Sequence, residues 1–179
     1  MAQTINDMTL VIGGEAGQGV ESGGEGLARA LVRGGLHVFV LFDYHSRIRG
    51  GHNFAQVRIS ERPLHTHSEP AHLVLALTEE AVRRHLGQLT PGGGIIYDEG
   101  LAVDAAAIAA QGGRAFPLPL RRIAREVGGD EVMANTAALG AFAGVVEFDP
   151  APLLSVIEDN FRSKGPAVVE GYRRVLAGA

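Results

Sequence analysis

Residues 10–20 read Leu10-Val11-Ile12-Gly13-Gly14-Glu15-Ala16-Gly17-Gln18-Gly19-Val20, and they set the architecture of this 179-residue chain. A short apolar run stops at a glycine cluster, and a helical pattern begins at Val20. This order predicts a buried strand, a tight turn and the N-terminus of a helix. The first amides of a helix have no partner within it, and the helix dipole favours an anion at that end. The glycines let a ligand or a neighbouring chain approach the backbone closely, so the turn is a candidate binding site.

Two common nucleotide-binding motifs do not fit this first loop, which comprises residues 14–19. A dinucleotide-binding fingerprint needs Gly-x-Gly-x-x-Gly, whereas the loop has Gly-x-x-Gly-x-Gly and Ser22 follows where a third glycine would fall. A P-loop ends in Gly-Lys-Ser/Thr, which residues 19–21 do not supply. The acidic Glu15 and Glu21 also weaken the attraction for an anion. Two interpretations stay open: a phosphate-binding turn, and a tight turn that serves only helix–sheet packing.

The rest of the chain alternates strands with helices and becomes helical towards its end. Apolar runs predict strands at residues 8–12, 37–42, 53–60, 72–77, 95–98 and 114–118, with a short return strand at 64–67 and a turn at 91–94. Helical patterns cover residues 20–32, 79–89, 104–111, 120–127, 133–146, 150–161 and 166–176. Residues 8–42 form a parallel βαβ unit, and the lack of a helix between 42 and 53 predicts antiparallel pairing there. The fold class is α/β, a three-layer α/β/α sandwich with a mostly parallel, mixed sheet and a helical C-terminal part, in a single domain of residues 1–179.

The composition excludes several classes of function. The chain has no Cys, which removes disulfides, thiolate nucleophiles and Cys-ligated zinc or Fe–S clusters. The net charge of −4 argues against non-specific nucleic-acid binding. No targeting segment or run long enough to span a bilayer is visible, so we expect a cytoplasmic protein with no nucleic-acid or membrane partner.

A second glycine-bearing loop follows the strand predicted at residues 37–42. It reads Tyr44-His45-Ser46-Arg47-Ile48-Arg49-Gly50-Gly51-His52. Loops that follow parallel strands emerge at the same edge of a sheet, where open α/β folds bind ligands, so the two loops should face each other. Arg47 and Arg49, with His45 and His52, could pair with an anion held near the amides of the first loop. A solvated basic loop, or one that pairs with carboxylates of a partner chain, is the alternative.

Two further sets of residues have the chemistry of a site but not the pattern. His65 and His67 are spaced to share one face of a strand, but no carboxylate or third histidine completes a set of ligands, so no metal is expected. Ser22, Ser46 and Ser60 are not within a Gly-x-Ser-x-Gly elbow, which argues against a hydrolase.

The two glycine motifs together resemble the gamma module of the 2-oxoacid:ferredoxin oxidoreductases, and the resemblance covers the whole chain in order. The family pattern of Gly-Gln-Gly, then Tyr with Arg-Gly-Gly, is kept at residues 17–19, at Tyr44 and at residues 49–51. The segment Ala134-Asn135-Thr136-Ala137-Ala138-Leu139-Gly140-Ala141 supports the match. The candidate cofactor-binding residues are Gly14, Gly17, Gln18, Gly19, Tyr44, Arg47, Arg49, Gly50, Gly51 and Asn135.

This resemblance implies a subunit and not a complete enzyme. The family's complex oxidatively decarboxylates a 2-oxoacid such as 2-oxoglutarate or pyruvate, makes an acyl-CoA and passes electrons to ferredoxin. Thiamine diphosphate, magnesium and Fe–S clusters lie on partners, namely thiamine-diphosphate-binding subunits and a ferredoxin-like Fe–S subunit, while the gamma module is associated with coenzyme A and assembly. The chain alone should be inactive and carries no catalytic residue. A purely architectural subunit and a stand-alone, Rossmann-like nucleotide-cofactor-binding module are the alternatives.

Overall fold

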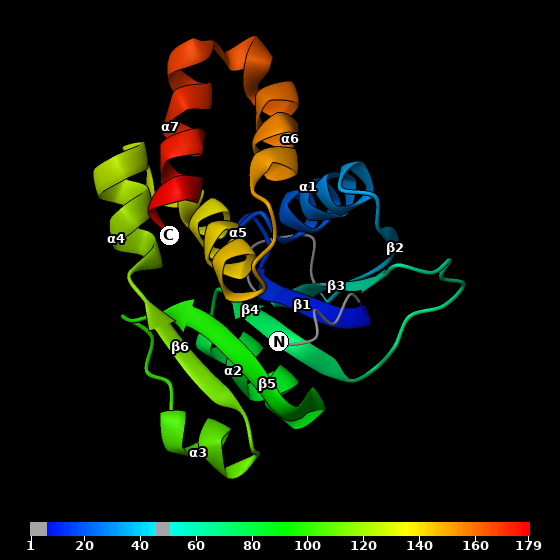
Figure 1. Ribbon diagram of the computed structural model, residues 1–179. Helices are drawn as coiled ribbons and strands as arrows, with labels where there is room; N and C mark the ends of the chain where they lie inside the picture. Colours follow the sequence, from blue (N-terminus) through cyan, green and yellow to red (C-terminus); the bar gives the residue numbers. More distant parts are fainter. Residues whose placement is uncertain (1–6, 46–50) are drawn as a thin grey trace.

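The strands of the computed structural model, which describes residues 7–45 and 51–179, form one mixed sheet (Figure 1). Their order across the sheet is β2-β3-β1-β4-β5-β6. The strands are β1 (Asp7–Glu15), β2 (His37–Tyr44), β3 (His52–Ser60), β4 (Ala71–Ala76), β5 (Leu89–Asp98) and β6 (Arg114–Leu118). Strands β1, β4, β5 and β6 run parallel, and β3 pairs antiparallel with both β1 and β2. The mixed sheet predicted from the sequence is confirmed.

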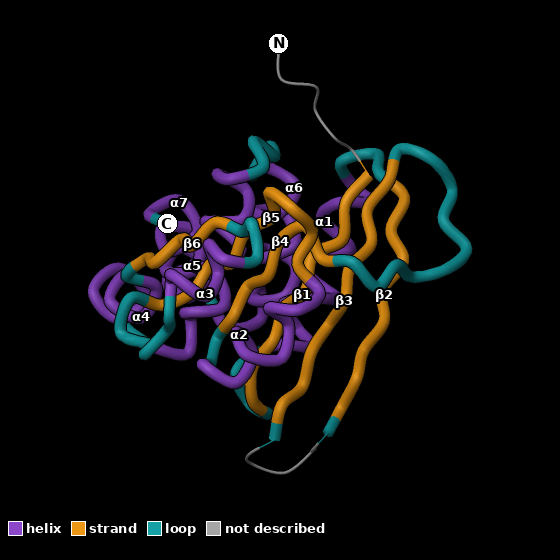
Figure 2. The backbone as a smooth tube through the Cα atoms, turned by 90° about the horizontal axis from the view of Figure 1, so that it is seen from below, coloured by secondary structure: helices purple, strands orange, loops and turns teal. Residues whose placement is uncertain are grey.

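Helices cover both faces of this sheet, which gives the expected three layers. The helices are α1 (Val20–Arg33), α2 (Glu79–His85), α3 (Ala105–Ala110), α4 (Leu120–Ile123), α5 (Ala134–Val145), α6 (Ala151–Phe161) and α7 (Pro166–Gly178). One face carries α1, α4 and α5, and the other carries α2 and α3 (Figures 1 and 2). Helices α6 and α7 form a hairpin that packs on α1 and α5, further from the sheet. The helical C-terminal part is therefore an additional layer on one side.

Strand β1 is buried on both faces, which explains why its apolar residues do not alternate with polar ones. Leu10 and Ile12 belong to the core under α1 and α5, and Val11 belongs to the smaller core under α2 and α3. These three side chains are at most 2% exposed. The central strand therefore anchors both cores.

Helix α1 lies very close to the sheet at Gly24. A Cβ atom at Gly24 would stand 2.7 Å from the Cβ atom of Ala55 in β3 and 3.1 Å from the ring of Phe42 in β2. The absence of a side chain at Gly24 is therefore what sets the distance between helix and sheet. The helix ends as expected at a pair of glycines, where Gly34 N–H donates to the carbonyl of Ala30 over 2.9 Å and Gly35 has a φ of +87°.

The βαβ unit is present, but β3 lies between its two strands. Strands β1 and β2 run in the same direction, and both pair with β3, so that Ser60 stands opposite Asp7 on one side and His37 on the other. The chain leaves β2 through a short connection that favours an antiparallel neighbour, and β3 then fills the space beside β1. As a consequence, β2 becomes the edge strand of the sheet.

Two local predictions are wrong. Residues 64–67 form no strand. Side chains of β3 bind the backbone in and just after this segment: Arg58 Nη1 donates to the carbonyl of Thr66 over 3.3 Å and Gln56 Nε2 to that of Ser68 over 2.8 Å. Residues 91–94 lie within β5 and not in a turn, because β5 starts at Leu89 opposite Ala71 and shifts register before Gly94 pairs with Leu73.

Candidate functional site

The first loop presents an uncapped helix N-terminus. It connects the end of β1 at Glu15 to the start of α1 at Val20. Gly17 and Gly19 have φ angles of +92° and +77°, a left-handed conformation that glycine adopts without steric cost. Gly19 is the N-cap of α1, and no side chain of the described residues caps the helix. The opening amides of α1 are of the kind that an anion can bind.

Gln18 and Gly14 close the loop upon itself. The Gln18 side-chain oxygen accepts a hydrogen bond from the Glu15 amide over 2.8 Å, and the Gln18 amide donates to the Glu15 carbonyl over 3.1 Å. A Cβ atom at Gly14 would stand 2.7 Å from that side-chain oxygen. These two predicted site residues therefore shape the turn, which agrees with the packing interpretation for this part of the loop.

Asn135 joins the first loop from the start of α5. Its Nδ2 atom donates to the carbonyl oxygen of Gly19 over 3.3 Å. Its side-chain oxygen accepts a hydrogen bond from the Thr136 hydroxyl over 3.3 Å. The third sequence motif is thus brought onto the first loop, and its contact there is with the backbone at the N-cap of α1.

Three hollows adjoin the first loop, and Gly17 lines each of them. The loop hollow, of about 610 Å³, lies between the first loop, Tyr44 and Asn53. The edge hollow, of about 390 Å³, lies where β1, β4 and β5 end, and Asp98 and Asn135 line it. The helix hollow, of about 310 Å³, is mostly apolar and lies between α1, α5, α6 and α7.

The edge hollow occupies the position at which open α/β sheets bind ligands. Helix α1 leaves β1 towards one face, and α2 leaves the neighbouring β4 towards the other. Such a reversal opens a crevice beyond the carboxyl ends of the two strands. Asp98 stands at the end of β5 and accepts hydrogen bonds from the amides of Gly100 and Arg121, at 3.0 and 2.8 Å. Its carboxylate therefore holds the start of α4 while lining the edge hollow.

The predicted second loop is only partly described. Tyr44 lines the loop hollow beside Gly17 and Gly19, so the structure brings the start of the second loop to the first loop. Gly51 has a φ of +84° just before β3. The predicted site residues Arg47, Arg49 and Gly50 lie outside the described residues.

The sequence reasoning missed Asn53. This side chain lines the loop hollow and is 5% exposed. It stands directly opposite Tyr44 in the β2–β3 pairing. The register of the predicted antiparallel pair was the signal that could have identified it. Among the described residues, the charged side chains that line the loop hollow are those of Glu15 and Glu21, so none of the described side chains there offers positive charge to an anion.

His52 does not supply that charge, and the suggestion that it pairs with an anion is wrong. It is 2% exposed, and its Nε2 atom lies 2.8 Å from Nε2 of the equally buried His85. The Nδ1 atom of His85 lies 2.7 Å from the side-chain oxygen of Gln88, which only accepts, so Nδ1 of His85 carries a proton. In the neutral pair, His52 Nε2–H therefore donates to His85, and no partner within the described residues reaches the buried Nδ1 of His52. Burial lowers the pKa of His52 to about 4 and also lowers the pKa of His85, so both rings are neutral at pH 7.

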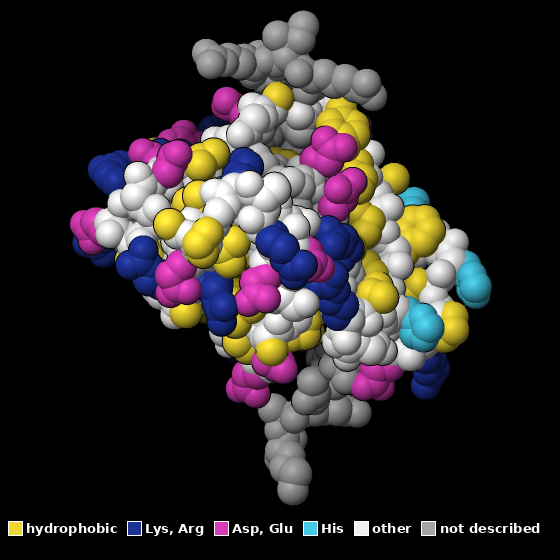
Figure 3. Space-filling model, turned by 90° about the horizontal axis from the view of Figure 1, so that it is seen from above, with side chains coloured by type: hydrophobic (Ala, Val, Ile, Leu, Met, Phe, Trp, Pro, Cys, Tyr) yellow, Lys and Arg dark blue, Asp and Glu magenta, His cyan; other side chains and the backbone are white. Residues whose placement is uncertain are grey.

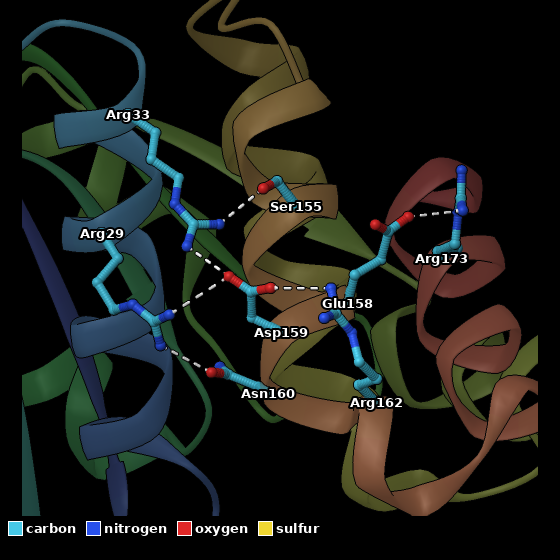
Figure 4. Close-up of polar contacts among 8 residues, drawn as sticks. All are labelled: Arg29, Arg33, Ser155, Glu158, Asp159, Asn160, Arg162 and Arg173. Atoms are coloured by element: carbon cyan, nitrogen blue, oxygen red, sulfur yellow. Dashed lines mark hydrogen bonds and ion pairs between the residues drawn. The ribbon is translucent and has the colours of Figure 1, made fainter.

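Ion pairs hold the α6–α7 hairpin against α1 and so shape the helix hollow (Figure 4). Arg33 Nη2 lies 2.5 Å from the carboxylate of Asp159, and Arg29 and Arg162 approach the same carboxylate at 3.8 and 3.3 Å. Arg29 also donates to Asn160 over 2.8 Å. The hydrogen bond from Arg33, with the charges of the other two guanidinium groups, lowers the pKa of Asp159.

Within residues 7–45 and 51–179, no three His, Asp or Glu side chains are arranged to hold a metal ion. None of the helices in those ranges is long and apolar enough to cross a bilayer.

The chain is similar in sequence to subunits of 2-oxoacid-oxidising enzymes from archaea. The chain is 30% identical over 135 residues to the 2-oxoglutarate synthase subunit KorC of Methanothermobacter thermautotrophicus, covering 73% of this chain and 71% of that subunit. It is 36% identical over 94 residues to subunit alpha of the 2-oxoacid:ferredoxin oxidoreductase 2 of Aeropyrum pernix, covering 52% of this chain and 15% of that subunit. The chain thus spans less than a sixth of the Aeropyrum subunit but most of the KorC subunit.

Solved structures share the fold. The 2-oxoglutarate:ferredoxin oxidoreductase from Magnetococcus marinus, solved with 2-oxoglutarate, coenzyme A and succinyl-CoA bound, superposes with a TM-score of 0.88 at 28% identity, over 97% of this chain and 30% of that one. A pyruvate oxidoreductase subunit from Thermotoga maritima superposes with a TM-score of 0.76 at 22% identity, over 97% of this chain and 94% of that one.

The family itself follows from a match along nearly the whole sequence. Residues 9–177 match the family described as Pyruvate ferredoxin/flavodoxin oxidoreductase. This match includes the first loop, the second loop and Asn135. The resemblance predicted from the sequence motifs is confirmed, and the chain belongs to the pyruvate ferredoxin/flavodoxin oxidoreductase family.

Proposed function

We propose that this chain is the gamma-type module of a 2-oxoacid:ferredoxin oxidoreductase and that it helps to bind coenzyme A. The observation that carries the proposal is the uncapped N-terminus of α1, which opens into the loop hollow beside Tyr44. The similar protein from Magnetococcus marinus, described with coenzyme A bound, supports the choice of ligand.

The backbone of the first loop favours a phosphate-bearing ligand, whereas the acidic side chains beside it disfavour one. The amides that open α1 are suited to a phosphate group, and Gly17 leaves open space beside them: apart from its chain neighbours, no described residue has an atom within 4 Å of where its Cβ would be. The carboxylates of Glu15 and Glu21 oppose an anion. Positive charge must therefore come from Arg47 and Arg49 of the second loop or from a partner subunit.

In this proposal the chain binds and orients, and it performs no redox step. Coenzyme A, when bound, supplies the thiol that accepts the acyl group. The amides at residues 20–22 hold a phosphate, and the Asn135 side chain keeps the carbonyl of Gly19, the N-cap residue, in place. A chain without Cys offers no thiolate for an Fe–S cluster. In this proposal thiamine diphosphate, magnesium and the Fe–S clusters belong on thiamine-diphosphate-binding and ferredoxin-like partner subunits, as the family resemblance implies. We expect no turnover of 2-oxoglutarate or pyruvate by this chain alone with a viologen dye.

The test uses Ser22, an exposed residue at the start of α1 that lines the loop hollow. In the assembled complex, Ser22→Glu places a carboxylate beside the opening amides of α1, where it competes with a phosphate. Losing one charge-assisted phosphate contact costs about 1.5–3 kcal/mol, so the KM for coenzyme A should rise about ten- to a hundredfold. The matched control, Ser22→Gln, has the same shape without the charge and should leave this KM nearly unchanged.

An architectural role is the second candidate, because the side chain of Gln18 and the space beside Gly14 are occupied by contacts within the chain and not left to a ligand. The two functions differ in the measured result. If the chain binds coenzyme A, Ser22→Glu should raise the KM for coenzyme A and leave the KM for the 2-oxoacid and the size of the complex unchanged. If Ser22→Glu leaves coenzyme A kinetics intact and dissociates the complex, the architectural function replaces the proposed one.

A further inference from the structure

The outer edge of β2 is an open row of backbone groups. The strand reads His37-Val38-Phe39-Val40-Leu41-Phe42-Asp43-Tyr44 and pairs with β3 in one unbroken register. Within residues 7–45 and 51–179, no backbone hydrogen bond joins residues 37–43 of β2 to a segment other than β3. Exposed edges are commonly protected by charges, proline, bulges or short length. From residues 38 to 42, β2 has none of these protections.

Partly exposed apolar side chains of β2 and α1 lie beside this open edge. Leu41 of β2 is 37% exposed, and Val32, in the last turn of α1 above the strand, is 58% exposed. Val38, Phe39 and Val40 are only partly buried. Figure 2 shows β2 as the outermost strand of the sheet, and Figure 3 shows hydrophobic atoms among histidine and other polar atoms on that side of the molecule. A strand with this edge and these side chains fits another extended, apolar strand.

The sequence of β2 is complementary to itself in one antiparallel register. Consider a twofold axis perpendicular to the sheet that passes midway between Val40 of the two copies. This axis keeps each face of the sheet on the same side in both copies. Because side chains alternate between the two faces, two residues that face each other must then both have odd numbers or both have even numbers. With Val40 opposite Val40 of the second copy, Phe39 faces Leu41 and Val38 faces Phe42. At both ends His37 then faces Asp43.

Neighbouring registers do not have this complementarity. A shift by two residues in one direction places Asp43 opposite Phe39, which desolvates a carboxylate against an aromatic ring. The opposite shift places His37 opposite Leu41 and leaves Asp43 facing Gly35. The register of two strands is selected by whether the side chains directly opposite each other form favourable or unfavourable pairs.

We propose that β2 pairs antiparallel with β2 of a second copy of this chain, about a twofold axis at Val40, so that one continuous sheet runs through both copies. This pairing of two copies does not involve coenzyme A, and its test is independent of the test of the proposed function.

A cysteine cross-link tests the axis, because the chain has no Cys of its own. Facing Cα atoms of antiparallel strands lie about 4.5–5.5 Å apart, within the range that a disulfide spans. Oxidation of the full chain carrying Val40→Cys should give a covalent dimer. The control His37→Cys should give none, because the two copies of residue 37 are separated by six strand residues, about 20 Å. A Val40→Cys chain that stays monomeric, or a His37→Cys chain that cross-links equally well, overturns the proposal.

A charge exchange tests the register. His37→Glu places a carboxylate opposite Asp43 of the second copy at both ends, which should weaken the dimer roughly tenfold in sedimentation equilibrium. Adding Asp43→Lys to the same chain should restore the dimer, because Glu then faces Lys. Residues 37 and 43 of one copy are too far apart to interact directly, so the restoration requires a second copy. An unmodified chain that is monomeric at every concentration, or a double variant no stronger than the single one, disproves the pairing.

Discussion

The side-chain amide of Asn135 donates a hydrogen bond to the carbonyl oxygen of Gly19, a residue 116 positions earlier in the chain. The contact places the start of α5 against the N-cap of α1, next to all three hollows of the candidate site. A Cβ atom at Gly19 would overlap the amide nitrogen of Asn135. The hydrogen bond from Asn135 therefore requires that residue 19 has no side chain.

Substitutions at these two positions should be non-additive. Gly19→Ala alone costs about 1–2 kcal/mol because alanine is strained at a φ of +77°, and the overlap with Asn135 adds to this cost. In an Asn135→Ala background the overlap disappears, so the same glycine substitution should cost less. A double-mutant cycle by urea denaturation should give a coupling of roughly 0.5–3 kcal/mol. Additive costs would mean that the loop moves away from Asn135 without penalty.

Two glycines of α1 should respond oppositely to the same substitution. Gly24→Ala should destabilise the chain by about 1–3 kcal/mol, because the new methyl group would meet Ala55 at 2.7 Å. Gly26→Ala in the same helix meets only Val156, at an ordinary 3.7 Å, and should stabilise the chain by up to about 1 kcal/mol through helix propensity. Thermal or urea unfolding of both variants measures the difference. Equal effects would show that α1 does not depend on close contact at Gly24.

The buried histidine pair should make the chain less stable in mild acid. The pKa of His52 is lowered from 6.5 to about 4 by burial, so between these values the unfolded chain binds more protons than the folded one. The free energy of unfolding should therefore be highest above pH 6.5 and fall as the pH drops towards 4, with a contribution of roughly 3 kcal/mol from His52. Urea unfolding at several pH values should show a shallower slope for His52→Phe. The exposed His65→Phe serves as the control and should keep the slope of the unmodified chain.

The contact between α1 and α6 should be sensitive to salt. Asp159→Asn removes the carboxylate shared by Arg29, Arg33 and Arg162 and should lower the melting temperature at low ionic strength. These side chains are partly exposed, so roughly 1 M salt, with a Debye length of about 3 Å, should remove most of the difference. Glu158→Gln is a suitable comparison, because Glu158 pairs with Arg173 of α7 and leaves the contact to α1 intact. A difference that persists at high salt would point to packing and not to charge.

Arg49 lies outside the described residues, and its expected role rests on the sequence. Arg49→Ala in the assembled complex should raise the KM for coenzyme A about ten- to a hundredfold, the value of one charge-assisted phosphate contact. The KM for the 2-oxoacid and the affinity for thiamine diphosphate should barely change, because those ligands belong to other modules. Steady-state kinetics together with size-exclusion chromatography measure both. Dissociation of the complex with unchanged coenzyme A kinetics would assign the second loop to an interface.

Several structural features could be predicted because they depend on nearby residues alone. The turn from β1 into α1 follows from the apolar run and the glycines of residues 10–20. Thr78 caps α2 as expected, accepting a hydrogen bond from the amide of Ala81 over 3.2 Å, because an N-cap needs only the next three residues. The antiparallel pairing of β2 with β3 also followed locally, from the short connection between them.

Other features depended on which distant segments meet. The sequence by itself determined the strand–turn–helix unit, the mixed sheet, the C-terminal helices and the absence of thiolate chemistry, since periodicity, turn residues and composition are local properties. Only the tertiary structure placed β3 between β1 and β2, buried His52 against His85, and set Asn135 on the backbone of Gly19. The physical reason is that these contacts join residues 33 or more positions apart, and they form only because the folding of the whole sheet and both cores offsets the chain entropy lost in bringing them together.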